Sequence, residues 1–358
     1  MKICYFGGYQ RDHSRNAVFL RALRQVGVEV IECQSRHPIR FLRYPILIIK
    51  YLRDCLQTDL ILVASACHNY VFLGWLLAKL TGKLLAFDPF FSLYDTLVQD
   101  RQLIRAGSLR ARWYWLLDKV TCTLAGKVLL DTDLHVKYFS RTFGLPDEKF
   151  CVVPVGADEA VFFSRLVSRS TGPRVIEVVY AGSFIPLHGI PCILEAAKLL
   201  EEENFHFTMI GDGQTFAESY QMAQNLSLSH VDFVGRLPRE VYAEHLARAD
   251  IVLGIFGTSD KSRRVIPCKV YDASAMGKAI ITGDTPAIRT FFSDNGNIVL
   301  CQPNDARSLA DKLRRLRDDN GLRYRIAQNA KLLFDQRFSS QMIGSMLLDC
   351  FKNILSGT

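Results

Sequence analysis

Short apolar runs alternate with helix-like segments along almost the whole chain, and this alternation constrains the fold of the 358 residues more than any other feature. The runs are rich in Val, Ile and Leu. Strands of this kind are buried on both faces, as in parallel sheets that helices cover on each side. The pattern therefore predicts a doubly wound α/β protein, in which ligands bind at the carboxyl ends of the strands.

Six strands are predicted in the first half of the chain. They are KICYFG (2–7), VEVIEC (28–33), DLILVA (59–64), KLLAF (83–87), KVLLD (127–131) and FCVVPVG (150–156). Helices are predicted over 14–26, 40–56, 70–80, 109–124 and 132–143. Because the same rhythm resumes after a break, we expect this half to be one domain, residues 1–165.

The second half repeats the alternation and predicts a domain of residues 166–338. Its strands are IEVVYAG (176–182), HFTMIGDG (206–213), VDFVG (231–235), DIVLGIF (250–256), AIITGD (279–284) and NIVLCQ (297–302). Its helices are 189–202, 214–226, 238–248, 269–276, 286–292 and others across 304–336. The Ser, Gly and Pro residues of RLVSRSTGPRV (165–175) indicate the linker. A last helix within 339–358 is expected to pack back on the first domain.

The net charge is +8 and it is unevenly spread. Residues 1–160 hold 21 Lys and Arg against 15 Asp and Glu, an excess of six. Residues 36–53 and 101–119 interleave these cations with large apolar or aromatic side chains, as helices on an anionic membrane surface do. An ordinary core-facing helix with a basic, solvated back fits equally well. No nucleic-acid motif accompanies the charge, so a nucleic-acid partner is not expected.

The ten cysteines form no C-x-x-C pair, and several lie in apolar runs. This usage indicates reduced thiols in a reducing compartment, and no metal site is expected. The start, MKICYFGG, runs straight into a strand pattern, so no signal peptide is expected. The apolar stretch at 70–78 is too short to cross a bilayer. We expect a cytoplasmic protein, alternatively one peripheral at the inner face of the cytoplasmic membrane.

Glycine turns follow three of the predicted strands, in FGGYQRD (6–12), AGSFIPLHG (181–189) and IGDGQTF (210–216). Glycine lets the backbone approach a phosphate, and the next helix offers unpaired N–H groups. None of the turns matches G-x-G-x-x-G or the P-loop, which argues against a dinucleotide dehydrogenase and a P-loop NTPase. The candidate ligand-binding glycines are Gly7, Gly8, Gly182, Gly211 and Gly213.

A fourth motif, VIPCKVYDASAMGKAI (265–280), places Lys269 and Asp272 at the start of a helix that follows Pro267. With AGSFIPLHGI, IGDGQ, VDFVGRLP and ARADIVLGIFG, it resembles the C-terminal domain of family-four glycosyltransferases. FGGYQRDHSRN and CVVPVGADEAVF (151–162) resemble N-terminal segments of the same family. The resemblance implies the GT-B fold, in which two Rossmann-like domains face each other across a cleft. It also implies a retaining, metal-independent enzyme that uses a nucleoside-diphosphate sugar and no other cofactor.

The resemblance assigns roles to individual residues. Asp272 takes the place of the second acid of the family's E-x7-E element, which binds the ribose, and Arg264 takes the place of the first. Ser183 and His188 stand where the family has phosphate-binding Arg and Lys, so Lys269 and its neighbours are expected to replace those cations. The full donor-binding set is Gly7, Gly8, Gly182, Ser183, His188, Gly211, Gly213, Arg236, Lys261, Lys269, Val270, Tyr271 and Asp272.

Structural roles remain open for the same residues. Lys269 is alternatively a solvated loop lysine, Asp272 a helix cap, His188 a turn residue, and Arg264 part of a structural ion pair.

The acceptor-side candidates are His13, His68, Asp88 and Asp95. Asp88 and Asp95 lie in AFDPFFSLYDT (86–96), at the end of a predicted strand, where a carboxylate can orient or deprotonate a hydroxyl. In the family's mechanism the departing phosphate takes the proton, so a protein base is not required. The catalytic candidates are Asp88, Arg264 and Lys269, whereas His135 is expected to pack or to cap a helix.

The sequence thus predicts sugar transfer from a nucleoside-diphosphate sugar to a hydroxyl acceptor. The basic, aromatic segments make a lipid-linked saccharide or an envelope or exopolysaccharide precursor the leading acceptor. Two alternatives stay open, which are a sugar-nucleotide epimerase of the same fold and a catalytically silent sugar-nucleotide-binding subunit.

Overall fold

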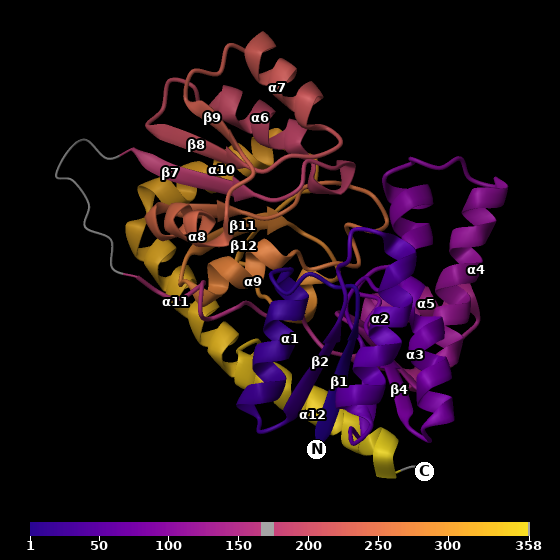
Figure 1. The fold of residues 1–358 in the computed structure, drawn as a ribbon. Coiled ribbons are helices and arrows are strands. Elements are labelled where there is room, and N and C mark those ends of the chain that lie inside the picture. The colour runs from indigo at the N-terminus through magenta and orange to yellow at the C-terminus, as the bar shows by residue number, and fades with distance from the viewer. Residues whose placement is uncertain (166–174, 357–358) are drawn as a thin grey trace. The chain divides into compact units, whose positions relative to one another are not determined.

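The computed structural model describes residues 1–165 and 175–356. The chain divides into two compact units. Unit 1 contains Met1–Gly156 and the C-terminal segment from Ser340, and unit 2 contains Ala157–Ser339. Most of the predicted linker falls on residues 166–174, outside the described residues. Each unit is built on one six-stranded parallel sheet with helices on both faces (Figure 1), which confirms the doubly wound α/β prediction.

The sheet of unit 1 has the order β2-β1-β3-β4-β5-β6. Its strands are β1 (Lys2–Gly7), β2 (Glu29–Gln34), β3 (Leu60–Val63), β4 (Leu84–Phe87), β5 (Lys127–Leu130) and β6 (Phe150–Val152). Its helices are α1 (Ser14–Gln25), α2 (Arg43–Lys50), α3 (His68–Leu80), α4 (Leu109–Leu124), α5 (Asp133–Phe143) and α12 (Ser340–Ser356). Short turns precede or extend several of them: η1 (Arg40–Leu42), η4 (Asp147–Lys149) and the π-helices η2 (Tyr51–Cys55) and η3 (Asp95–Asp100).

The sheet of unit 2 has the order β12-β11-β10-β7-β8-β9. Its strands are β7 (Ile176–Ala181), β8 (Phe205–Ile210), β9 (Val231–Gly235), β10 (Ile251–Leu253), β11 (Ala279–Gly283) and β12 (Val299–Cys301). Its helices are α6 (Ile190–Leu199), α7 (Phe216–Asn225), α8 (Arg239–Arg248), α9 (Cys268–Ala275), α10 (Ala306–Asp318) and α11 (Asn320–Arg337), with the 3-10 turns η5 (Pro186–His188) and η6 (Ile288–Thr290).

The strand order reverses direction once in each sheet, between β1 and β3 in unit 1 and between β7 and β10 in unit 2. At such a point the flanking loops diverge, and a crevice opens at the carboxyl ends of the two strands. The central strands are apolar on both faces because both faces are covered, and Ile3 to Phe6 of β1 are completely buried. The topology therefore marks one candidate site in each unit.

Three expectations from the sequence are wrong. The helix predicted over 286–292 is only the single 3-10 turn η6, at whose start Thr285 Oγ1 accepts from the Ile288 N–H. The strand predicted over 150–156 ends at Val152, because Pro154 has no N–H for a sheet hydrogen bond. The cysteines are not all free thiols, since a disulfide joins Cys151 on β6 to Cys350 on α12 across a Cα–Cα distance of 6.4 Å.

The predicted return of the C-terminal helix occurs within unit 1, where α12 packs along α1 (Figure 1). Gly344 makes this approach possible, because a Cβ atom there would overlap the carbonyl oxygen of Ala22 and lie 2.7 Å from Val26 Cγ1. Among the described residues, no helix is both long and apolar enough to cross a membrane.

We expect Gly344→Ala to destabilise the protein by about 1–3 kcal/mol, because the added methyl group overpacks the α1–α12 contact. In an ordinary helix interior the same change stabilises by up to about 1 kcal/mol, so the sign of the effect is diagnostic. Gly321→Ala on α11 is the control, since its nearest contact would be Asp319 Oδ1 at 3.4 Å. Urea unfolding of the three proteins measures the difference, and a more stable Gly344→Ala variant contradicts this account.

Candidate functional site

Three segments of unit 2 meet at the ammonium group of Lys269, in the first turn of α9. Its Nζ lies 3.7 Å from the centroid of the Tyr180 ring on β7 and 3.4 Å from the carbonyl oxygen of Gly254, which follows β10. A Cβ atom on Gly182 would lie 2.9 Å from the same Nζ, so the glycine lets the β7 loop pass this close. Lys269 therefore stands at the topological switch point of the unit 2 sheet.

Lys269 is a buried cation without a counter-ion. The residue is only 5% exposed, and burial holds the pKa of its ammonium well below the usual value. Within residues 1–165 and 175–356, no carboxylate pairs with it, and the face of Tyr180 is its main electrostatic partner. Burying an unpaired charge costs free energy, which an anionic ligand would offset. The surroundings of Lys269 thus suit an anion.

Asp272 lies one turn further along α9 and is also almost completely buried, at 4% exposure. Burial raises the pKa of its carboxyl to about 8, with a smaller lowering by Arg239 and a smaller raising by Asp158. No hydrogen bond reaches this carboxyl from the described part of the chain. The hydroxyl of Tyr242 on α8, which feels the charge of Asp272, is buried and equally without a hydrogen-bond partner there. The site therefore holds two polar groups that a ligand could satisfy.

Arg239 and Asp158 are neighbours of this site that the sequence analysis missed. Arg239 Nη2 lies 3.2 Å from Asp158 Oδ2, and its guanidinium stacks 5.6 Å from the centroid of the Phe162 ring, which also contacts Tyr242. The pair ties the segment that begins unit 2 to the start of α8. Asp158 lies in the motif CVVPVGADEAVF (151–162), whereas Arg239 directly follows VDFVGRLP (231–238), and these positions were the available signal.

The second glycine turn of unit 2 supports the first through backbone contact. A Cβ atom on Gly211 would lie 2.9 Å from the carbonyl carbon of Gly182, and one on Gly213 would lie 2.5 Å from the carbonyl oxygen of Phe184. Both glycines have positive φ angles, of 136° and 157°. Close packing of the β7 and β8 loops thus explains these two glycines without a ligand, and their donor-binding role stays a prediction.

The remaining predicted donor residues fall into three groups. His188 is buried, and its Nδ1 faces the hydroxyl of Tyr180 and the carbonyl oxygen of Ser183, so the ring organises the turn, whereas the Ser183 side chain is exposed. Val270 and Tyr271 are completely buried in the core, and the Val270 N–H already donates to the carbonyl oxygen of Pro267, so no described contact tests their predicted part in donor binding. The third group is cationic: Lys261 is buried, Arg264 is half-buried, and exposed Arg236 lies 3.8 Å from Asp212.

In unit 1, the carboxyl ends of β1 and β3 also approach closely. A Cβ atom on Gly7 would lie 2.9 Å from Cys67 Sγ, and one on Gly8 would lie 2.5 Å from the hydroxyl of Tyr70 at the start of α3. Packing again accounts for these glycines, and no described contact tests their predicted part in donor binding.

Asp88 is held in an ion pair that links three elements of unit 1. Both of its carboxylate oxygens lie 2.9 Å from Nε of Arg15 on α1, and Arg15 also donates to the carbonyl oxygen of Val153. Both side chains of the pair are completely buried. Burial raises the pKa of Asp88 to about 6 in spite of Arg15. This geometry favours a positioning role for Asp88 over direct contact with an acceptor.

His68 forms a second buried pair in unit 1. Its Nε2 lies 3.4 Å from Oδ1 of Asp118 on α4, and Asp118 accepts hydrogen bonds from the Ser92 hydroxyl and from the N–H groups of Leu93 and Tyr94. Burial lowers the pKa of His68 to about 3, so its imidazole is neutral at pH 7. Asp118 was missed because α4 lies far away in the sequence.

The other two acceptor-side candidates differ in exposure. Asp95 is buried at the start of η3, whereas His13, just before α1, is partly exposed and packs against the ring of Phe90. His135 is buried against Phe139 and pairs with Asp131, as expected of a packing residue.

Comparison with known proteins identifies the family of unit 2. Residues 170–333 match the model of glycosyl transferases, group 1. This part of the chain is similar to the group 1 glycosyl transferases. The match includes the Gly182 turn and the first turn of α9, so the motifs that suggested the family lie inside it. The resemblance inferred from the sequence is thereby confirmed at this level.

Two curated relatives show how far the similarity extends. The amylovoran biosynthesis glycosyltransferase AmsK of Erwinia amylovora is 26% identical over 177 residues, which cover 48% of this chain and 43% of AmsK. The N,N'-diacetylbacillosaminyl-diphospho-undecaprenol alpha-1,3-N-acetylgalactosaminyltransferase of Campylobacter jejuni is 23% identical over 232 residues, covering 60% of this chain and 58% of the relative. The chain thus spans less than two thirds of the length of either relative.

The similarity to solved structures covers both units of this chain. HepE of Anabaena, in complex with UDP-glucose, superposes with a TM-score of 0.72 at 15% identity and covers 99% of this chain and 100% of its own. This likeness confirms the GT-B fold.

We expect Asp272→Asn to stabilise the free protein at neutral and alkaline pH. The folded-state pKa of about 8 lies above the ordinary value of 3.8, so the wild type loses stability as pH rises between these values, by about 1.4 kcal/mol for each unit of the pKa difference. Thermal unfolding at pH 4 and pH 8 measures the effect, with Asp311→Asn on the exposed side of α10 as the control. A variant that melts no higher than the wild type at pH 8 contradicts the burial argument.

Proposed function

We propose that this protein transfers a sugar from a nucleoside-diphosphate sugar to a hydroxyl acceptor, with retention of configuration and without a metal ion. One observation carries the proposal. A cation, Lys269, and an acid, Asp272, are both buried in α9 beside the Gly182 turn, and neither has an ionic partner in direct contact within the described chain. Two such groups are costly to ionise in a free protein, and a ligand with a diphosphate and a ribose matches both.

In this proposal, Lys269 binds the diphosphate of the donor and Asp272 binds its ribose. Lys269 faces the diphosphate at the start of α9, where the positive end of the helix dipole also lies, so it offsets the charge that grows on the leaving group. A well-placed donor of this kind contributes about 3–4 kcal/mol to transition-state stabilisation. Asp272 accepts hydrogen bonds from the ribose hydroxyls, and these favour its ionised form. Lys261 and Arg264, on the neighbouring loop, supply the charge that Ser183 and His188 lack.

On the acceptor side, the departing phosphate takes the proton of the attacking hydroxyl. Asp88 fits this mechanism because its oxygens face Arg15 and not solvent. Of the four acceptor-side candidates, His13 alone is partly exposed, and it is the one best placed to touch an acceptor.

UDP and UDP-glucose are the first donors to test, because HepE of Anabaena binds both. We expect Lys269→Met and Asp272→Asn each to weaken UDP binding by about 10- to 100-fold, the value of a charge-assisted hydrogen bond of 1.5–3 kcal/mol. Lys278→Met is the matched control, because this lysine donates to backbone carbonyls of Ala247 and Ala249 beyond the other end of α9. Calorimetry measures the affinities, and equal binding by all three variants refutes the site.

Product analysis with the same proteins separates the alternatives. A transferase forms product only when an acceptor is present, and it remains active in EDTA if no metal ion is needed. An epimerase converts the donor alone, and a silent binding subunit gives no turnover, including no slow donor hydrolysis. The anomeric configuration of the product, read by NMR, tests retention.

We further propose that the acceptor is lipid-linked and that unit 1 reaches it from a membrane surface. Three helical segments carry exposed apolar stripes at helical spacing. The stripe residues are Phe41, Ile49, Leu52 and Leu56 along η1, α2 and η2, then Phe72, Leu76 and Leu80 on α3, and Leu109, Trp113, Leu116 and Val120 on α4. The α3 stripe was not expected from the sequence, because its helix carries few charges.

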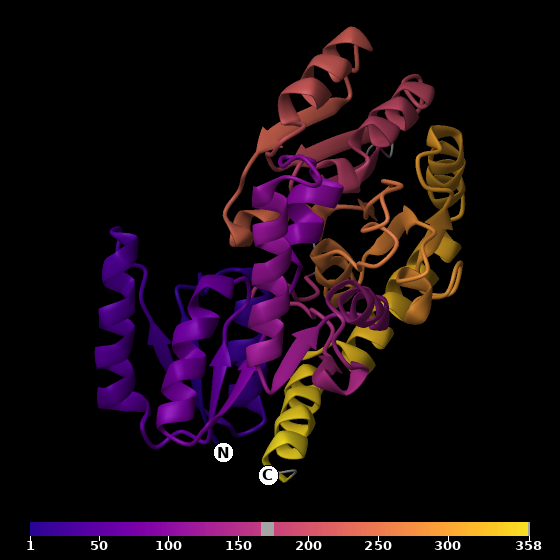
Figure 2. The ribbon, with the colours of Figure 1, turned by 90° about the vertical axis from the view of Figure 1, so that its right-hand side faces the viewer.

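The three helices form one layer. Right-handed crossovers place α2, α3 and α4 on the same face of the unit 1 sheet. The rings of Tyr44 and Tyr70 lie 5.5 Å apart and join α2 to α3, while α3 contacts α4 directly. Figure 2 shows these helices upright and next to one another. The exposed stripes therefore belong to the outer surface of one layer.

Cations border the stripes on the same layer. Arg40, Arg110 and Arg112 are exposed, and Lys79 and Lys119 lie about 5 Å over the rings of Trp75 and Trp115. Apolar stripes flanked by cations and tryptophans match the interface of an anionic bilayer. The undecaprenol-linked acceptor in the name of the Campylobacter jejuni relative supports a lipid-linked substrate.

Vesicle co-sedimentation tests the membrane surface. We expect the wild type to bind anionic vesicles at low salt, and Phe72→Ser/Leu80→Ser to reduce binding at least tenfold, because two apolar contacts are lost while no charge changes. Leu332→Ser, an exposed apolar position on α11 in unit 2, is the control. Failure of the wild type to bind such vesicles removes the argument, and a change of oligomeric state in the variant assigns the stripes to a protein interface instead.

A further inference from the structure

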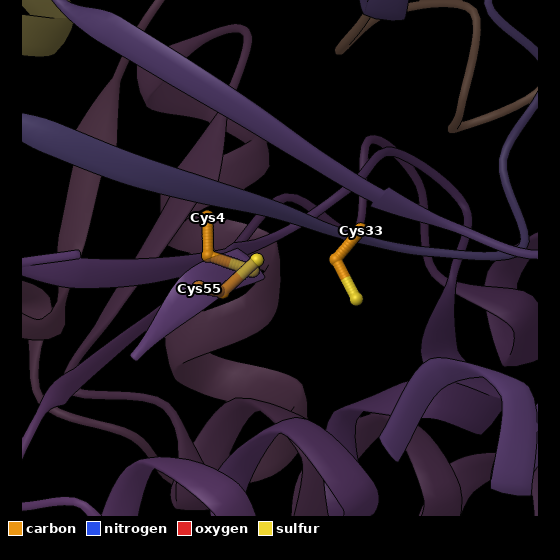
Figure 3. Close-up of side chains that lie close together, drawn as sticks. All are labelled: Cys4, Cys33 and Cys55. Atoms are coloured by element: carbon orange, nitrogen blue, oxygen red, sulfur yellow. The ribbon is translucent and has the colours of Figure 1, made fainter. Parts of the chain in front are cut away.

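Three free cysteines lie close together in the interior of unit 1 (Figure 3). Cys4 lies on β1, Cys33 on β2 and Cys55 at the end of η2. Their Sγ atoms all lie within 4.8 Å of one another, and none of the three residues is more than 1% exposed. No spacing rule finds this cluster, because its members are 29 and 22 residues apart in the sequence.

The fold brings the three thiols together through two features. β1 and β2 are parallel neighbours in which Phe6 pairs with Cys33, so Cys4, two residues before Phe6, points to the same face as Cys33. The π-helix η2 continues α2 over that face, and its wider turn ends at Cys55. π-helical turns are rare and often occur at functional sites. The π-helical turn η2 is therefore a second observation at this place, independent of the positions of the sulfur atoms.

The donor set selects a class of ligand. Three sulfur atoms, with no carboxylate or imidazole in the cluster, favour a soft cation over Mg²⁺ or Ca²⁺. A metal–sulfur bond of about 2.3 Å puts the sulfurs of a planar three-coordinate site roughly 4 Å apart. Sulfurs within 4.8 Å of one another therefore need to move inward by at most about 0.5 Å each.

Local electrostatics prepares the cluster for a cation. Lys50, whose Nζ donates to the carbonyl oxygen of Gln34 next to Cys33, places a positive charge near the cluster. A divalent cation that binds in place of the three thiol protons releases three protons and leaves one negative charge on the site, which Lys50 offsets.

We propose that Cys4, Cys33 and Cys55 bind a thiophilic divalent cation of the zinc and cadmium class. The ion joins β1, β2 and η2, and so fixes the end of the helical segment that carries the first apolar stripe to the edge of the sheet. This site is separate from the donor site and does not depend on the proposed function. It departs from the expectation that no metal binds, which rested on spacing alone.

Cadmium is the probe, because sulfur-to-cadmium charge transfer gives an ultraviolet band that reports thiolate ligands. We expect the reduced full-length protein, produced with Cd²⁺ in the medium or incubated with it, to hold one ion in native mass spectrometry. Binding raises the melting temperature and protects three thiols from alkylation. Titration into the metal-free protein releases three protons for each ion, because each thiol loses its proton on binding.

Variants identify the ligands. Cys33→Ala and Cys55→Ala each abolish the band and the bound mass, whereas Cys122→Ala, which removes a free cysteine buried on α4, leaves both unchanged. If the cluster variants do not fold, thiol protection in the wild type still decides the question. A wild type that binds no Cd²⁺, or that loses it equally in Cys122→Ala, shows that the three thiols are inert packing, as buried cysteines often are.

Discussion

The buried ammonium of Lys269 is the interaction on which the candidate donor site depends. It joins the ring of Tyr180 on β7, the carbonyl oxygen of Gly254 after β10 and the first turn of α9, and it requires glycine at position 182. An unpaired cation at this position lowers the stability of the free protein, as the buried acid Asp272 does. A site that is unfavourable when empty is therefore built into the second sheet, and binding of a doubly complementary ligand releases that cost.

Around this site, several residues depart from the family pattern, and these departures are linked because they all concern the placement of positive charge. Ser183 and His188 replace the two expected phosphate cations, and His188 instead organises the turn through Tyr180. The cationic groups shift to α9 and to the loop before it, where Lys269, Lys261 and Arg264 lie. Arg239 adds a positive charge near Asp272 and is itself paired with Asp158. The candidate site thus keeps its positive charge, but the cationic side chains come from other elements than in the family pattern.

Unit 1 combines rigid internal pairs with an unusual surface. The pairs of Arg15 with Asp88 and of His68 with Asp118 bind loops at the carboxyl ends of the strands to helices that lie far away in the sequence. On the layer formed by α2, α3 and α4, apolar side chains remain exposed at helical spacing. The cysteine cluster lies beneath one of these segments, so the surface, the sheet edge and the proposed metal site meet at η2.

The sequence by itself determined the alternation of strands and helices, both sheets, the positions of Lys269 and Asp272 and the family, because periodicity and short motifs are local. It failed where local rules were weak, as at η6, or where tertiary contact decides. The tertiary structure buries Lys269 and Asp272 without an ionic partner in direct contact among the described residues. It also pairs Asp88 with Arg15, joins Cys151 to Cys350 and brings Cys4, Cys33 and Cys55 together. These features unite residues 22 to 199 positions apart, and only the packing of distant segments brings such side chains into contact.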